Sequence, residues 1–415
     1  MDKMNFNVDK NNGKEIVTEE LDETEDEDFE LESSSDNSSS SQSSGSKNDT
    51  GKEKLIKMMF MAIVVIAIGV LLIIFITSLF GGKKTYEEIE EIMATAAESY
   101  FGDHPESLPK KDGGTQVVEV SVLISEGKMK DLSKYTDSVC TGSVKVQKTG
   151  SNYIYVPKLD CGEAYSTKEL YKVVRDDNRI VSSGYGLYNK DGNFVFRGEQ
   201  VNNYVKLDNA LWRIVKLNSS NNLVLVMDEP LSTLVPWDDR YNQETNYNAG
   251  INNFSSSLIK EKLIELYNTE AEDVTEILLS DKDKGRIVPH NLCIGKRGLT
   301  QAGAEQAVEC KEVIRDQKLS ILTAADFMNA SVDANCTNPS SLTCQNYNYL
   351  ITDNAWWLAT SVTGSSTDAY MVEANSGLMA KKAMMYARIR PVVYLNSEVM
   401  YKSGSGTAED PYLVK

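Results

Sequence analysis

Residues 211–231 read LWRIVKLNSSNNLVLVMDEPL, two mainly apolar runs separated by an Asn- and Ser-rich break. Such runs, bounded by turn-forming residues, predict two strands. The pattern continues toward the N-terminus, where GYGLYN at 184–189 and GNFVFRGE at 192–199 are further short strands broken by Gly and Asn. The region therefore predicts an antiparallel sheet.

Helical and strand-like segments alternate on the C-terminal side. We expect helices at 255–268 and 271–281, followed by a loop-rich region with four cysteines. Helices inserted among antiparallel strands define an α+β fold class, and the length suits one domain over residues 183–415. The chain closes with the strand-like or helical runs ILTAADFMNA, AWWLATSV, DAYMVEANSGLM and YARIRPVVYLNS.

Large side chains within these runs indicate the core. Trp212, Trp356 and Trp357 lie in apolar segments. We expect them to be buried rather than to bind ligand, because an aromatic side chain buries roughly 150–250 Å². Arg388 and Arg390 alternate along one strand, and we expect them to form ion pairs within the fold.

The C-terminal stretch, about residues 205–397, resembles an uncharacterised bacterial domain family that is distantly related to the formylglycine-generating (sulfatase-modifying) enzymes and to the C-type-lectin-like fold. The resemblance implies a compact α+β domain with long surface loops that are often used for binding, and it implies no particular ligand. The terminal GSGTAEDPYLVK looks like the closing strand of many bacterial surface modules. The segments that carry the resemblance are 211–231, 254–268, 319–330, 355–362 and 387–395.

A smaller domain is expected over residues 85–182. Residues 85–101 have apolar side chains at helical spacing, and three strands are predicted at 115–124, 143–149 and 152–159. Cysteines lie before the second strand and after the third, so that a disulfide there would hold a hairpin in a module with a small core.

The six cysteines have a pattern typical of disulfides. Nearest neighbours in the sequence are separated by 21, 17 and 8 positions, and no CxxC or CxxH spacing exists. Pairing of neighbours is the simplest of 15 possible arrangements. Because disulfides persist in oxidising compartments, we expect the part of the chain after residue 81 to lie outside the cell. The cysteines are Cys140, Cys161, Cys293, Cys310, Cys336 and Cys344.

Residues 58–80, MMFMAIVVIAIGVLLIIFITSLF, contain no charge over 23 positions. This length suffices to cross a ~30 Å hydrocarbon core. We therefore predict an uncleaved signal anchor at 55–82 and a single-pass cell-membrane protein. Lysines at 47, 52, 54 and 57 precede the span and favour a cytoplasmic N-terminus with extracellular C-terminal domains.

The charge is concentrated at the N-terminus. The chain has a formal net charge of −18, and residues 1–50 carry 15 acidic and four basic side chains, a net −11. This balance argues against a nucleic-acid partner. Residues 1–54 are predicted to be a disordered acidic cytoplasmic tail, either a solvated spacer or a site that docks a cytoplasmic partner or is phosphorylated.

The sequence offers no convincing catalytic motif. Ser257 and Lys260 have S-x-x-K spacing, and residues 148–150 read KTG, but their order is reversed relative to penicillin-binding proteins. Residues 341–344 read SLTC, similar to the L-x-T-C of sortases, with His290 and Arg388 as distant partners. Formylglycine-generating enzymes work through a copper-binding cysteine pair, whereas Cys336 and Cys344 lie in a polar loop. We therefore predict that the chain is not an enzyme and needs no cofactor.

Residues 235–253, VPWDDRYNQETNYNAGINN, are the candidate binding loop. Aromatic rings beside amides and carboxylates suit sugars, and adjacent carboxylates with carbonyls suit Ca²⁺. Because the E-P-N and W-N-D signatures of calcium-dependent lectins are absent, no metal is assigned. The alternative is a surface loop that only covers the core. The candidate residues are Trp237, Asp238, Asp239, Tyr241 and Tyr247.

These observations predict a non-catalytic cell-surface protein that displays a lectin-like module for an extracellular glycan or protein ligand. A second hypothesis is an envelope assembly or scaffolding component, with a pilin-like stalk and a tail that recruits a cytoplasmic partner. A third, less favoured, is an enzyme of the sulfatase-modifying type.

Overall fold

The computed structural model describes residues 82–190, 192–268 and 279–415. Two hydrophobic cores lie within them. Ile89 to Cys161 contribute the smaller core, and Leu170 to Tyr412 the larger one. The described chain therefore contains two separately packed modules.

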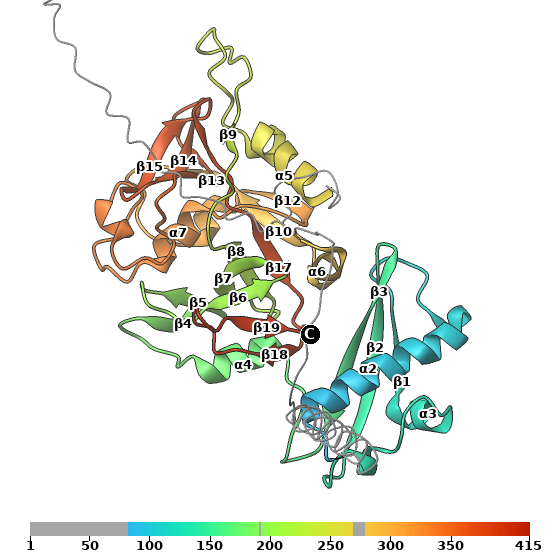
Figure 1. The fold of residues 1–415 in the computed structure, drawn as a ribbon. Coiled ribbons are helices and arrows are strands. Elements are labelled where there is room, and N and C mark those ends of the chain that lie inside the picture. Colours follow the sequence, from blue (N-terminus) through green and yellow to red (C-terminus); the bar gives the residue numbers. More distant parts are fainter. Residues whose placement is uncertain (1–81, 191, 269–278) are drawn as a thin grey trace, which may run out of the picture. The chain divides into compact units, whose positions relative to one another are not determined.

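The N-terminal module is a three-stranded antiparallel sheet of order β1-β2-β3 with one long helix, α2, packed on it (Figure 1). The Thr85 hydroxyl accepts the N–H of Glu88, and the Glu88 carboxylate accepts the N–H of Thr85. This capping box fixes the start of α2. The elements are α2 Tyr86–Asp103, η1 Pro105–Ser107, β1 Thr115–Glu119, α3 Val120–Ser125, η2 Leu132–Lys134, β2 Thr141–Thr149 and β3 Asn152–Asp160.

The strand predicted at 115–124 is wrong in its second half. Pairing of β1 with β2 ends at Glu119, opposite Ser143, and the chain then turns into α3. Val120 and Leu123 are buried and lie three positions apart, so they share one face of a helix. A β-branched run was mistaken for a continuous strand because its apolar residues also fit helical spacing.

The C-terminal module is built mainly from strands. In the described residues, an eight-stranded sheet has the order β17-β8-β7-β6-β19-β18, with β5 joining β7 and β4 joining β5, and a six-stranded sheet has the order β15-β14-β13-β16-β9, with β11 beside β13. A third sheet pairs β10 with β12. The strands of the first sheet are β4 Gly186–Lys190, β5 Asn193–Arg197, β6 Tyr204–Leu207, β7 Ala210–Leu217, β8 Leu223–Met227, β17 Val392–Leu395, β18 Tyr401–Ser403 and β19 Tyr412–Val414. The others are β9 Leu234–Pro236, β10 His290–Ile294, β11 Lys296–Arg297, β12 Glu312–Gln317, β13 Trp356–Val362, β14 Asp368–Glu373, β15 Gly377–Lys382 and β16 Tyr386–Arg388.

Short helices lie among these sheets. The larger core contains side chains of α4, which lies within the range predicted for the first domain. Part of the helix predicted at 271–281 lies outside the described residues. The helical elements are α4 Leu170–Asp177, η3 Phe254–Ser256, α5 Leu258–Asn268, α6 Asp281–Arg286, η4 Gln306–Glu309, α7 Ala324–Ala330 and η5 Leu342–Gln345.

The hairpin predicted at 211–231 is confirmed as β7 and β8. Leu217 pairs with Leu223, and the side chain of Asn218 accepts the N–H groups of Ser220 and Asn222, each at 3.0 Å. Asn221 has a φ of 59°, which Asn tolerates better than most residues. The Asn-rich break therefore forms the turn between β7 and β8, through the side chain of Asn218 and the backbone conformation of Asn221.

The predicted core tryptophans are also confirmed, because Trp212, Trp356 and Trp357 are all fully buried. The expected role of the arginines is wrong. Arg390 donates to the backbone oxygens of three residues, and Arg388 donates to that of Leu231. Backbone carbonyls, rather than carboxylates, satisfy these guanidinium groups.

All six cysteines form disulfides between nearest neighbours, as predicted. The bonds are Cys140–Cys161, Cys293–Cys310 and Cys336–Cys344. The first brackets the β2–β3 hairpin, and the second links the ends of the segment between β10 and β12. Both modules are therefore covalently cross-linked.

The predicted membrane helix requires a correction of the fold class and of the localisation. No helix within 82–190, 192–268 and 279–415 is long and apolar enough to cross a membrane. Among these helices α2 is the longest, with 18 residues, but it carries six carboxylates, which are costly in hydrocarbon. Residues 58–80, on which the prediction was based, lie outside the described residues, as does the acidic tail at 1–54. Over the residues that the structure describes, the fold class is α+β without a spanning helix, and the single-pass placement and the membrane as a partner are not retained.

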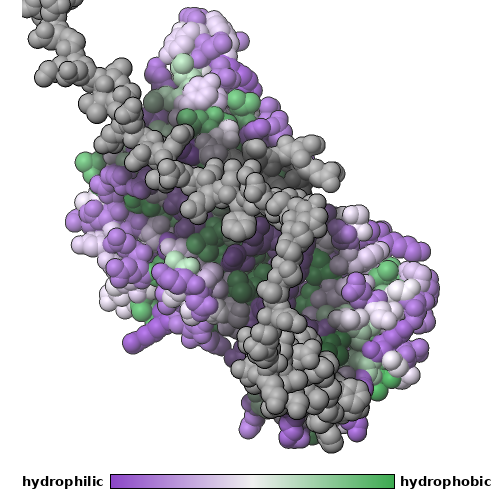
Figure 2. Space-filling view, viewed as in Figure 1, coloured by the Kyte–Doolittle hydropathy of each residue, from purple (hydrophilic) through white to green (hydrophobic). Residues whose placement is uncertain are grey.

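The surface of the described modules is mixed in character. Hydrophilic residues predominate on the face shown in Figure 2, and apolar residues form smaller groups among them. Leu234, Met384, Met385 and Tyr386 are exposed near the paired strands β9 and β16. Scattered apolar residues are normal on soluble surfaces, but a group of this kind is a candidate contact surface.

Peptide mapping under non-reducing conditions should recover only the three nearest-neighbour disulfides, and thiol titration of the denatured full chain should find no free cysteine. Replacing both Cys293 and Cys310 by Ser should lower the free energy of unfolding by about 3 kcal/mol, because the unfolded chain gains loop entropy. Urea denaturation would measure this loss. A linked peptide joining any other pair of cysteines would contradict the assignment.

Candidate binding cleft

The long loop that follows β9 projects past the strands (Figure 1). A cleft of about 940 Å³ lies beside this loop. This volume is typical of sites for small molecules or for a few sugar units. Four segments line it: residues 241–244, residues 251–254, the facing parts of β10, β11 and β12, and the turn between β13 and β14. Its polar side chains are Tyr241, Asn242, Gln243, Glu244, Asn252, Asn253, Lys296, Lys311, Glu312, Ser361, Thr363, Ser365 and Ser366.

Trp237, the first candidate residue, lies in the core rather than in the cleft. Its side chain is fully buried, and its indole N–H donates to the backbone oxygen of Leu358 at 2.9 Å. Its ring meets that of Phe254 edge-on, with centroids 5.7 Å apart. Trp237 therefore attaches the base of the loop to β13 and offers no face to a ligand.

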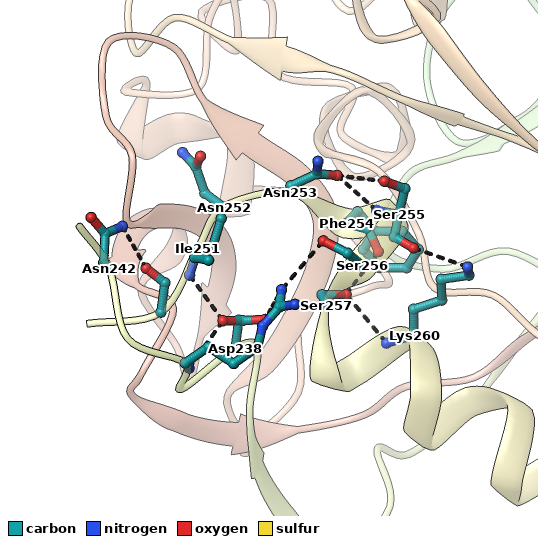
Figure 3. Close-up of polar contacts among 12 residues, drawn as sticks. Asp238, Asn242, Ile251, Asn252, Asn253, Phe254, Ser255, Ser256, Ser257 and Lys260 are labelled. Atoms are coloured by element: carbon teal, nitrogen blue, oxygen red, sulfur yellow. Dashed lines mark hydrogen bonds and ion pairs between the residues drawn. The ribbon is translucent and has the colours of Figure 1, made fainter. Parts of the chain in front are cut away.

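Asp238 is also fully buried, and its side chain forms hydrogen bonds within the loop (Figure 3). Its carboxylate accepts the backbone N–H groups of Ile251 at 2.9 Å and of Arg240 at 3.1 Å, and Nε of Arg240 at 2.8 Å. Gly250 has a φ of 80°, and a Cβ there would come within 2.1 Å of the Asp238 carbonyl oxygen. The two ends of the loop are thus held together by a carboxylate and by a glycine that no other residue can replace without strain.

The other three candidate residues are exposed, but only Tyr241 lines the cleft. The hydroxyl of Tyr247 accepts a hydrogen bond from Nζ of Lys382 at 2.8 Å, and this bond raises the pKa of Lys382. Asp239 is exposed and is not among the lining residues. The structure therefore brings one of the five candidate residues into the site.

Asn252 is the organising residue of the cleft, and sequence reasoning missed it. Its side chain is 3% exposed, and Nδ2 lies 2.8–3.3 Å from the carbonyl oxygens of Val362, Ser365 and Asp368. Its backbone oxygen accepts the hydroxyl of Ser361 at 2.8 Å. One buried amide therefore joins the loop to the turn between β13 and β14. The Asn-rich run of 242–253 was a signal for turns, but nothing in it distinguished Asn252 from its neighbours.

Lys296, also missed, is held by that amide. Its Nζ donates to Oδ1 of Asn252 at 3.0 Å and to the carbonyl oxygen of Ser365 at 3.3 Å. Lys311 and Glu312 line the same part of the cleft, at the start of β12. These residues are more than 40 positions from the candidate loop, so no local pattern could have linked them to it.

A buried ion pair supports the side of the cleft that carries Lys296 and Lys311. Arg297 and Glu309 are both fully buried, with Nε of the arginine 2.6 Å from Oε1 of the glutamate. The guanidinium also donates to the backbone oxygens of Gly303 at 2.8 Å and of Glu305 at 2.9 Å. Together with the disulfide Cys293–Cys310, these bonds fix the segment between β10 and β12.

The S-x-x-K residues do not form a catalytic pair (Figure 3). Ser257 is fully buried, its hydroxyl donates to the Phe254 carbonyl at 2.9 Å, and it accepts the N–H of Lys260 at 3.3 Å. Nζ of Lys260 instead donates to the carbonyl of Ser255 at 3.0 Å. Ser257 therefore supports the start of α5, and residues 148–150 lie in the N-terminal module.

The remaining candidate catalytic residues, Cys344 and His290, also have partners within the fold. Cys344 is in a disulfide, and His290 is hydrogen-bonded through Nε2 to Oγ of Ser320 at 2.7 Å. Both members of the His290–Ser320 pair are buried, and neither lines the cleft. Burial, with a contribution from Lys216, lowers the pKa of His290 to about 3. In the described residues, no group of three or more His, Cys, Asp or Glu side chains is arranged to hold a metal ion.

Asp208 and Asp283 form a carboxyl pair outside the cleft. Asp283 is fully buried in α6 and pairs with Arg286, while Asp208 accepts the N–H of Ser280 at 2.9 Å. Burial and, to a smaller extent, its hydrogen bond to Asp208 raise the pKa of Asp283 to about 6. Burial also raises the pKa of Asp208, but hydrogen bonds from Asp283 and Ser280 outweigh this and lower it. Of the two carboxyl groups, Asp283 is therefore the one that binds a proton as the pH falls toward about 6.

Comparison with protein-family models, with curated proteins and with solved structures finds no match to this chain. The resemblance to the formylglycine-generating enzymes and to the C-type-lectin-like fold therefore stays a prediction.

The different positions of Trp237 and Tyr241 predict a large loss of stability on truncation of the first and almost none on truncation of the second. Trp237→Ala should lower the free energy of unfolding by about 3–5 kcal/mol, because it leaves a cavity in the core. Tyr241→Ala should change it by less than about 0.5 kcal/mol, because the ring is exposed. Urea denaturation of the two variants and the parent chain measures both values. Equal destabilisation would contradict the placement of the two rings.

The buried carboxyl pair predicts a pH-dependent stability difference. Asp283 keeps its proton up to about pH 6 when folded, but loses it near pH 4 when unfolded. Its contribution to stability is therefore complete below pH 4 and is lost as pH rises through 6, a change of about 2–3 kcal/mol. Asp283→Asn should remove this loss, so that the free energy of unfolding of the variant minus that of the parent rises between pH 4 and 7.

Asp353→Asn, at an exposed carboxylate, is the control and should show no such change between pH 4 and 7. Parallel curves for the parent and Asp283→Asn would contradict the raised pKa of Asp283.

Proposed function

We propose that the C-terminal module is a non-catalytic binding module and that its cleft binds a glycan. The single observation that carries this proposal is the cleft of about 940 Å³ between the loop after β9 and the β10–β12 hairpin. It lies on one side of the loop that the sequence marked as a binding element, although most of the residues that line it come from elsewhere.

The lining chemistry favours carbohydrate. Sugars present several hydroxyl groups, each of which donates and accepts hydrogen bonds, and amide and hydroxyl side chains do the same. Gln243, Asn253, Thr363 and Ser366 offer such groups in the cleft. Tyr241, 52% exposed, supplies the apolar surface on which a sugar ring packs.

Calcium forms no part of the proposal. Asp238, the first of the adjacent carboxylates that suggested a calcium site, is buried and bound to Arg240, while Asp239 is exposed outside the cleft. The ligand is therefore expected to bind through amides, hydroxyls and lysines.

The three disulfides favour an oxidising compartment, so the proposed site of action is extracellular. They also engage every cysteine of the chain, and no thiol is left for the copper-binding pair of a sulfatase-modifying enzyme. The scaffolding hypothesis depends on the acidic tail and on residues 58–80, which lie outside the described residues.

A protein ligand is a second candidate, because Leu234, Met384, Met385 and Tyr386 form an exposed apolar group at the β9–β16 pair. Methionine and aromatic side chains are typical of protein interfaces. This group does not line the cleft, so that the two candidates can be separated by substitution.

A glycan array probed with the purified full chain, followed by calorimetry with the best oligosaccharide, tests the proposal. Tyr241→Ala should weaken binding about tenfold or more, through loss of ring packing worth about 1.4 kcal/mol. Tyr386→Ala removes an exposed tyrosine outside the cleft and should leave the affinity unchanged. Failure of the array to detect any glycan, or equal losses in the two variants, would overturn the proposal.

A further inference from the structure

Resting on the proposed function, we infer that the cleft selects glycans that bear a single carboxylate, and that Lys296 binds this group. The ligand class is thus an acidic sugar, such as a uronic acid or another sugar acid within an oligosaccharide. The inference depends on how Lys296 is held and on which charges surround it.

The ammonium group of Lys296 is fixed with one donor to spare. It has three N–H donors. Two of them are used by Oδ1 of Asn252 at 3.0 Å and by the carbonyl oxygen of Ser365 at 3.3 Å. Both acceptors are neutral, so the positive charge is positioned without a direct carboxylate partner, and the third donor remains for a ligand.

The orientation of Asn252 is dictated by its surroundings. Three carbonyl oxygens, those of Val362, Ser365 and Asp368, surround Nδ2. Only an N–H group satisfies these acceptors, so Oδ1 must be the atom that faces Lys296. Because Asn252 is buried, its Oδ1 is a fixed acceptor for the exposed Lys296, and preorganisation of this kind increases affinity.

The other charges of the cleft set the preferred number of carboxylates. In the described residues, neither Lys296 nor Lys311 forms an ion pair with a carboxylate, although fifteen other lysine and arginine side chains do. Glu244 and Glu312 also line the cleft and balance the two lysines. A polyanion would be repelled by these glutamates, whereas one carboxylate placed at Lys296 gains a fixed partner at little cost.

The turn between β13 and β14 completes the site for a sugar acid. Ser365 supplies the carbonyl that holds Lys296, and Thr363 and Ser366 line the cleft beside it. Their hydroxyls are available to the ring hydroxyls of the same sugar. Charge recognition and hydroxyl recognition thus come from one short turn.

The test is calorimetry with the full chain and matched pairs of probes: oligosaccharides of galacturonic, glucuronic and N-acetylneuraminic acid, each beside its methyl ester. At least one acid should bind about tenfold or more tightly than its ester, and the preference should shrink between 0.05 and 0.5 M NaCl, since salt screens the pair. Heparin, a polyanion, should bind no better than the single acid.

Variants assign the effect to one side chain. Lys296→Met should abolish the preference for acid over ester while binding of the ester persists, and Lys296→Arg should restore part of it. Lys262→Met, at an exposed lysine of α5 outside the cleft, is the matched control and should keep the preference. Thermal melts establish that each variant is folded. If Lys296→Met does not fold, the acid-to-ester ratio of the parent chain still decides whether the cleft prefers a carboxylate.

Two results with acids and esters would overturn the inference: equal binding of acids and esters by the parent chain, or a preference that survives in Lys296→Met. In both cases the glycans still bind, so the proposed function stands. Absence of binding by every glycan would remove the proposed function and this inference with it. Tighter binding of heparin than of any single acid would also overturn it, since the glutamates of the cleft would then not limit its charge.

Discussion

The pair of Arg297 and Glu309 is the constraint on which the arrangement of the cleft depends. Both side chains are fully buried, and removal of two charges from water is costly unless every donor finds a partner. The chain meets this requirement by wrapping residues 303–309 around the guanidinium, so that backbone oxygens accept the donors that the carboxylate does not. The backbone N–H of Ala325, in α7, also lies against Glu309. A segment without long regular structure is thereby given one conformation.

The segment that this ion pair fixes forms one side of the cleft. The segment fixed by the ion pair and by Cys293–Cys310 carries Lys296 at one end and Lys311 at the other. On the opposite side, Asp238 holds the two ends of the loop together, and Asn252 fastens the loop to β13 and β14. The carboxylate of Asp238 and the side-chain nitrogen of Asn252 are buried and form their hydrogen bonds within the protein. The atoms that fix the shape of the cleft are therefore largely distinct from those that would touch a ligand.

This separation explains how much of the structure could be predicted. The hairpin of β7 and β8, the core tryptophans and the cysteine pairing follow from local pattern, because alternation, turn residues and sequence separation are short-range signals. The change from β1 to α3 was missed because Val120 and Leu123 fit both a strand and a helix in a run of apolar residues.

The site itself was only partly predictable. Composition identified a loop that lies beside the cleft, but it included Trp237 and Asp238 among the candidate binding residues, since aromatic rings beside carboxylates are typical of sugar sites. Whether such residues face inward or outward depends on β13, more than 100 positions away, where Leu358 accepts the indole N–H. Lys296 gave no local signal, because its significance arises only when Asn252, 44 positions earlier in the chain, meets it in space.

The loop after β9 is rich in polar residues, but few of them are free to face a ligand, because most are needed for hydrogen bonds within the protein. A loop of this length must satisfy its own backbone donors and acceptors, and a buried group without a partner is costly. Asn242, Asp238 and Asn252 spend most of their hydrogen-bonding capacity on that task. What is left for recognition is one exposed ring, several hydroxyls and amides at the rim, and an ammonium whose position is set by a saturated amide. In the proposed site, selectivity comes from the ammonium group of Lys296, which the fold positions through hydrogen bonds to neutral groups.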